Sequence, residues 1–146
     1  MRRIVSVLML VGVTAWTGAT VAGQAAQKVE YDVFCKLPDA DAKRQAFMAA
    51  SPDNRAVLVR TQLERWRDAN RARLSDKQLS ALAELIAVIT PDTYTDGPNG
   101  EEARVKARSV SESQRPLFTM DEHQAMQPNA PCIAKVKAPV GVAGAS

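Results

Sequence analysis

The chain has 146 residues and a formal net charge of +3, with 24% charged and 5% aromatic residues. This length excludes a large multidomain protein. Between Lys28 and Lys137 acidic and basic residues are mixed, which argues against a strongly basic protein built to bind nucleic acid or an anionic membrane surface.

The first residues have the order of a secretory signal peptide. Arg2 and Arg3 give a positive head, residues 4–13 are largely apolar, and small residues dominate from 18 to 26. The apolar run is shorter than the roughly 20 residues that a membrane-spanning helix needs. We therefore expect a signal peptide over residues 1–23, cleaved between 22 and 26. The mature protein is expected in the periplasm or outside the cell, with no stable membrane anchor.

Removal of this leader changes the charge balance. Arg2 and Arg3 leave with it, so the basic residues fall from 19 to 17 against 16 acidic ones, a net charge of +1. About 120 residues remain, which is the size of one domain. A nucleic-acid partner is not expected for a chain with so small a basic excess.

Two cysteines remain, Cys35 near the start of the mature chain and Cys132 near its end. In an oxidising compartment such a pair most simply forms a disulfide. Closing a loop of about 100 residues stabilises a fold by up to about 4–5 kcal/mol in the chain-entropy model. Two separate thiols, one of them reactive, are the alternative. Val33 and Phe34, rather than small residues, precede Cys35, so lipid attachment there is not expected.

Residues 24–38 are expected to form an extended arm. Within them, Tyr31–Leu37 is short and alternates between apolar or aromatic and polar residues, which fits a strand or an extended segment. No second strand is predicted to pair with it, so we favour the arm. Phe34 and Leu37 would then pack onto the helices that follow.

Residues 39–113 are expected to form the helical domain. Asp39 is a suitable N-cap, because its carboxylate accepts a hydrogen bond from a first-turn amide. The alanine-rich segment 40–50 predicts the first helix, anchored by Phe47. Ser51 and Pro52 then predict the start of the second helix, since proline at the first helical position loses no hydrogen bond.

The second helix is expected to run to about Arg71, and a third follows. The apolar stripe of the second helix has helical spacing and comprises Val59, Leu63 and Trp66. The third helix begins with a capping box of Ser75 and Gln78 and a hydrophobic staple of Leu74 and Leu79. Its apolar stripe ends at Thr90–Pro91, because a residue before proline avoids helical geometry.

A shorter fourth helix is expected over 101–110, after the turn-rich segment 96–100. Residues 114–146 contain four prolines and no sustained period, so we expect a tail that wraps the bundle and is pinned by Cys132. The predicted fold is therefore all-α: a small bundle of three to four helices with extended N- and C-terminal arms.

The mature sequence offers little for catalysis. Its one histidine, His123, follows Asp121 and Glu122, and this group suits a general base or a metal ligand as well as a solvated polar turn. No second histidine completes a zinc site, and pairing of His123 with a Cys132 thiolate requires the disulfide to be absent. We expect no catalytic residue, no metal, no cofactor and no enzymatic activity.

Several arginines lie on the second helix. The candidate interaction surface for an acidic partner comprises Arg60, Arg65, Arg67 and Arg71. These residues do not share one helical stripe, and Glu64 and Asp68 lie among them. A solvated face of paired charges is the alternative reading.

The stretch 46–94 resembles the small exported bacterial proteins described as bacteriocin fulvocin C-related. It reads F-M-A-A-S-P-x-x-R, L-x-R-x-Q-L, L-S-x-x-Q-L-x-x-L-x-x-L and I-T-P-D-x-Y. The resemblance covers about a third of the chain. It implies an exported helical protein that acts through protein contacts, in killing or in immunity to killing, and it transfers no catalytic residue.

A second resemblance is narrower. Leu74–Gln78 is similar to the L-T-x-x-Q motif of periplasmic helical chaperones and stress sensors, which usually carry it twice. Here the second helix begins with Ser51-Pro52-Asp53-Asn54, without the leucine or the glutamine. This resemblance implies, as the alternative function, a holdase or stress-binding protein that forms a homodimer.

Overall fold

The computed structural model describes residues 28–133, and every regular element among them is helical. The α-helices are α1 (Tyr31–Cys35), α2 (Ala40–Ala49), α3 (Pro52–Asn70), α4 (Asp76–Val88), α5 (Pro98–Gln114) and α6 (Met120–Met126). Three 3-10 turns connect them: η1 (Arg71–Arg73), η2 (Pro91–Tyr94) and η3 (Arg115–Leu117). The expectation of an all-α bundle is confirmed.

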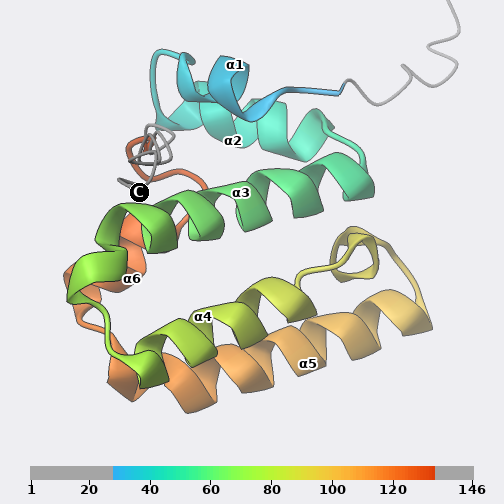
Figure 1. Cartoon of the computed structure of the whole chain (residues 1–146). Helices are drawn as coiled ribbons and strands as arrows, with labels where there is room; N and C mark the ends of the chain where they lie inside the picture. Colours follow the sequence, from blue (N-terminus) through green and yellow to red (C-terminus); the bar gives the residue numbers. More distant parts are fainter. Residues whose placement is uncertain (1–27, 134–146) are drawn as a thin grey trace, which may run out of the picture.

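The helices stack in layers (Figure 1). Helices α1 and α2 lie over α3, and α4 and α5 run side by side beneath it. Helix α6 lies alongside α3, where it closes one end of the bundle. Segments from both ends of the described chain therefore meet on α3, the longest helix.

The predicted helix starts are confirmed by their caps. The Asp39 carboxylate accepts from the amide of Ala42 at 2.8 Å, and Ser51 Oγ accepts from the amide of Asn54 at 3.2 Å. Ser75 and Gln78 form the complete capping box of α4. Such local hydrogen bonds satisfy amides that the first turn of a helix leaves without partners. Helix boundaries of this kind are therefore set by neighbouring residues.

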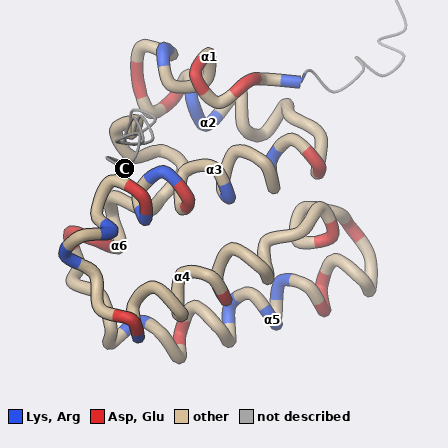
Figure 2. The backbone as a smooth tube through the Cα atoms, viewed as in Figure 1, with Lys and Arg blue, Asp and Glu red and all other residues tan. Residues whose placement is uncertain are grey.

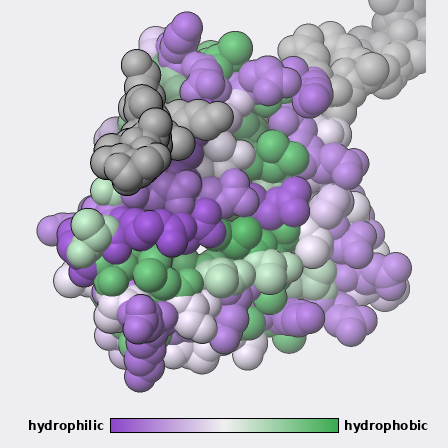
Figure 3. Space-filling view, in the orientation of Figure 1, coloured by the Kyte–Doolittle hydropathy of each residue, from purple (hydrophilic) through white to green (hydrophobic). Residues whose placement is uncertain are grey.

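The main core lies between α3, α4 and α6. Its buried members are Leu63, Trp66, Leu74, Ala81, Leu82, Phe118 and Met126. The Trp66 and Phe118 rings meet edge to face, with centroids 6.1 Å apart. On the face seen in Figure 3, hydrophobic residues gather in a band between α3 and α4, flanked by hydrophilic residues. Burial of these side chains is the main term that holds the layers together.

A second, smaller core joins α1 to α3. Its buried members are Tyr31, Phe34 and Leu58. The extended conformation expected for Tyr31–Leu37 is wrong over Tyr31–Cys35, which forms one helical turn with Phe34 N–H donating to the Glu30 carbonyl at 2.9 Å. The alternating pattern does not distinguish a strand from this turn, because a single helical turn places Tyr31 and Phe34 on one face and leaves Val33 58% exposed.

Helix α6 lies within the segment 114–146, where an irregular tail was expected. Its start carries a capping box, since Thr119 Oγ1 accepts from the Glu122 amide and the Glu122 carboxylate accepts from the Thr119 amide. This is the same signal that predicted α4. Together with α1, helix α6 raises the number of α-helices among the described residues above the expected three to four.

Helix α5 is also longer than the expected 101–110, because Pro98 stands in its first turn. Gly97 precedes it with a φ of +93°, a conformation that favours glycine. A Cβ atom on Gly100 would come within 2.0 Å of the Thr95 carbonyl oxygen. Glycine at 100 therefore allows α5 to begin directly against the η2 turn.

The predicted signal peptide and its cleavage region, like residues 134–146 of the predicted tail, lie outside the described residues. Between residues 28 and 133, no helix combines the length and apolar character that crossing a membrane requires.

Candidate binding hollow

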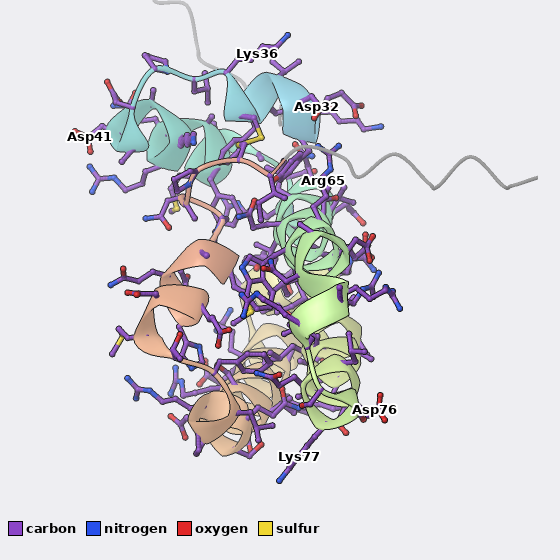
Figure 4. The ribbon with its side chains drawn as sticks, turned by 60° about the vertical axis from the view of Figure 1, so that its left-hand side comes forward. Asp32, Lys36, Asp41, Arg65, Asp76 and Lys77 are labelled. Carbon is purple, nitrogen blue, oxygen red and sulfur yellow. A yellow bond between two sulfur atoms is a disulfide. The ribbon has the colours of Figure 1, made fainter. Side chains whose placement is uncertain are left out.

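Three of the four candidate arginines on α3 and η1 form ion pairs within the chain. Arg65 has the least exposed side chain of these three, at 17%, and it contacts the Asp32 carboxylate at 2.8 Å and the Ile133 carbonyl at 3.2 Å. Its guanidinium also lies 4.4 Å from the centroid of the Tyr31 ring. Figure 4 shows Arg65 and Asp32 at the corner where α1 lies over α3. Arg65 thus ties α1 and the segment after α6 to α3.

The side chains of Arg67 and Arg71 are more exposed than that of Arg65. Arg67 and Arg71 both contact the Asp68 carboxylate, at 3.0 and 3.4 Å. Arg60 is half-buried and forms no ion pair with another residue of the described range. Acidic and basic residues alternate over the helices (Figure 2). The use of this surface by an acidic partner stays a prediction.

The two cysteines are paired. Cys35, at the end of α1, and Cys132 have their sulfur atoms 2.20 Å apart and their Cα atoms 5.5 Å apart. A buried polar network lies beside the bond: the Tyr31 hydroxyl donates to Gln62 Oε1, and Gln62 Nε2 donates to the Ala125 carbonyl at 2.8 Å. Burial raises the pKa of Tyr31 above its ordinary value, so the hydroxyl is protonated and able to donate at neutral pH. These contacts fix the chain that follows α6.

His123 lies on α6 and faces η3. Its Nε2 is 3.0 Å from the Arg115 carbonyl oxygen, and its ring meets Phe118 edge to face at 5.9 Å. Among residues 28–133, no group of three or more His, Cys, Asp or Glu side chains is arranged to hold a metal ion. Cys132, the thiol considered as a partner of His123, is bonded to Cys35.

His123 borders an apolar cavity that we call the inner cavity. Four helices contribute to it, and its volume is about 150 Å³. Its walls come from α3, α4, α5, α6 and the residues that follow α6: Val59, Leu63, Leu85, Ile89, Ala107, Ser111, His123, Met126, Gln127 and Pro128. Six of these side chains are apolar, apart from the proline, so the inner cavity suits an apolar group.

A second hollow, the outer hollow, adjoins the inner cavity at Ser111, His123 and Gln127, which border both. Its volume is about 310 Å³. Its further lining residues are polar or charged, except Met120: Glu112, Arg115, Met120 and Gln124. An apolar space with a few polar and charged residues beside it is the usual construction of a binding site.

The inner cavity could not be found from the sequence, although its parts were visible. Val59 and Leu63 belong to the apolar stripe predicted for the second helix, and Leu85 and Ile89 lie in the segment predicted as the third helix, before Thr90–Pro91. The missing element was α6, which closes the cavity with His123 and Met126. The capping box of Thr119 and Glu122 was the available signal for that helix.

No protein-family model matches this chain, no curated protein matches it, and no solved structure matches it. The bacteriocin-related and chaperone-like resemblances therefore stay expectations from the sequence.

Proposed function

We propose that this protein is an exported, non-enzymatic binding module that acts by taking up an apolar side chain of another protein in the inner cavity. The observation that carries the proposal is the inner cavity itself, a mainly apolar space of about 150 Å³ that Ser111, His123 and Gln127 also border. An engineered apolar cavity of about this volume binds benzene. The space therefore suits one branched or aromatic side chain.

The resemblance to bacteriocin fulvocin C-related proteins suggests the setting of this contact. In that setting the partner is a protein of a competing or producing cell, and binding leads to killing or to protection. The holdase alternative has less support. A holdase needs a continuous exposed apolar surface, whereas the large exposed apolar residues of the described part lie on five different helices: Val33, Met48, Val57, Val105 and Met120.

A selection from displayed peptides that end in a free C-terminus, against the immobilised mature protein, tests the proposal. We expect the selected peptides to share one large apolar residue. Ser111→Trp should abolish their binding, because Ser111 is exposed and borders both the inner cavity and the outer hollow. Ser109→Trp is the matched control, since Ser109 is exposed on the same helix and borders neither.

Peptides that bind both tryptophan variants equally well would contradict the proposal, as would a selection that yields no apolar consensus. The biological setting is tested by adding the protein to lawns of the producing strain and of its relatives and measuring their growth. Inhibition or protection that is lost in Ser111→Trp but kept in Ser109→Trp is the expected result.

A further inference from the structure

We propose that the inner cavity and the outer hollow together recognise the C-terminal residue of a peptide chain. Its apolar side chain enters the inner cavity, and its free carboxylate binds Arg115 in the outer hollow. This inference rests on the proposed function, and it adds the chemistry that selects the partner: a chain end, rather than an internal segment, is bound.

The two volumes fit one residue and the backbone before it. The inner cavity, at about 150 Å³, suits one apolar side chain. The outer hollow, at about 310 Å³, is roughly twice as large and borders Arg115. The additional space suits the peptide unit that precedes a C-terminal residue, which favours a peptide over a free amino acid.

Arg115 is the cation placed to hold the carboxylate. It is exposed, borders the outer hollow and forms no ion pair with any residue between 28 and 133. Its backbone is held by η3 and by the contact of its carbonyl with His123 at 3.0 Å. A guanidinium group offers two parallel N–H donors that match the two oxygens of a carboxylate.

The outer hollow also supplies an acceptor for a peptide N–H. The Glu112 carboxylate borders it and forms no ion pair with Arg115. His123 borders both spaces, and its Nε2 is engaged with the Arg115 carbonyl oxygen. One cationic donor beside one acceptor complements the carboxylate and the N–H of a C-terminal residue.

The test compares two acetylated peptides, Gly-Gly-Gly-Gly-Leu with a free carboxylate and the same peptide with a C-terminal amide. Binding to the mature protein is followed by chemical-shift changes of backbone amides, including those of Ser111 and His123. We expect the acid to bind at least tenfold more tightly than the amide. Arg115→Gln should lower the affinity for the acid to that for the amide, and leave the amide unaffected.

Arg108→Gln is the matched control, because Arg108 is an exposed arginine of α5 that borders neither the inner cavity nor the outer hollow. It should preserve the preference for the acid. Equal affinities for acid and amide would overturn the inference and leave apolar docking intact. Free leucine that binds as tightly as the acid peptide would overturn it in favour of an amino-acid site. If neither peptide binds, the inference fails, and the display selection decides separately on the proposed function.

Discussion

Gln62 is the buried polar residue on which most of the network beside the disulfide depends. It is 0% exposed, accepts from the Tyr31 hydroxyl and donates to the Ala125 carbonyl. A buried group that loses its hydrogen-bond partner costs about 1–3 kcal/mol. The side chain of Gln62 therefore links α1, α3 and α6 through directional contacts that apolar packing does not supply.

We expect Gln62→Leu to lower the free energy of unfolding by about 3 kcal/mol, because it leaves two buried groups without their partner. Urea unfolding followed by circular dichroism measures this. Tyr31→Phe and the double variant complete the cycle. The double variant should lose less free energy of unfolding than the two single variants lose in sum, since both changes remove the same hydrogen bond. Strictly additive effects would mean that Tyr31 and Gln62 are not coupled.

Glu122 makes the stability of the fold depend on pH. Its hydrogen bonds to Arg73 at 2.6 Å and to the Thr119 amide at 2.9 Å favour the ionised carboxylate, and hold the pKa of Glu122 below its ordinary value of 4.5. A lowered pKa in the folded state contributes stability that is present above the ordinary pKa and is lost as the pH falls through the folded value.

Glu122→Gln should therefore destabilise the protein at pH 7 by up to about 1 kcal/mol, the usual scale of a partly exposed ion pair, because glutamine can still accept from the Thr119 amide. The difference from the wild type should shrink as the pH falls below about 4.5. Thermal unfolding between pH 7 and pH 3 measures it. Asp121→Asn, a change at an exposed neighbour, is the control. A stability difference between the wild type and Glu122→Gln that grows toward low pH would contradict a lowered pKa of Glu122.

At the scale of an element, the start of α5 depends on the close approach of Gly100 to the η2 turn. Alanine normally stabilises a helix relative to glycine by about 1 kcal/mol. At this position the sign is reversed, because a Cβ atom would lie 2.0 Å from the backbone oxygen of Thr95. Either α5 or η2 must move to relieve the contact.

Gly100→Ala should destabilise the fold by about 1–3 kcal/mol, the typical cost of forcing extra volume into a packed site. Asn99→Ala is the matched control at an exposed neighbour in the same turn, and it should change stability much less. Differential scanning calorimetry compares the two. An increase in Tm for Gly100→Ala would mean that α5 does not pack against η2 as described.

Helices α1 and α6 show where local patterns succeed and fail. The capping boxes of Ser75 with Gln78 and of Thr119 with Glu122 have equivalent geometry, so both helix starts could be predicted from the sequence. The turn at Tyr31–Cys35 could not, because its Glu30 cap makes no side-chain hydrogen bond and its two buried residues gain their stability from α3.

At the scale of the whole molecule, the Cys35–Cys132 disulfide joins α1 to the chain after α6 across 97 residues. The bond acts together with Arg65, which contacts Asp32 and the Ile133 carbonyl on the two joined segments. Pro128, in the segment that leads to Cys132, is also a wall of the inner cavity. The disulfide therefore restrains one side of the proposed binding site.

Replacement of both cysteines by serine should lower the free energy of unfolding by up to about 4–5 kcal/mol, because the unfolded chain regains the entropy of a long loop. For a domain of this size the Tm should fall by about 10 °C or more. Alkylation and intact mass before and after reduction establish that the native thiols are blocked. Two thiols that react without reduction, or an unchanged Tm, would contradict the pairing.

The features that the sequence determined by itself depend on residues close to one another along the chain. The caps at Asp39, Ser51 and Ser75 and the apolar stripes of α3 and α4 depend on residues within one or two turns, so the sequence determined an all-α bundle and the start of its principal helices. The pairing of the two cysteines followed from their number and the expected compartment.

Only the tertiary structure decided where these parts meet. The inner cavity takes Val59, Leu85, Ala107 and Met126 from four helices, and the Arg65–Asp32 contact joins residues 33 positions apart. Such contacts depend on how the layers pack, because burial of apolar surface is non-directional and does not by itself specify which helices become neighbours. The sequence therefore determined the helices, and their packing created the hollow.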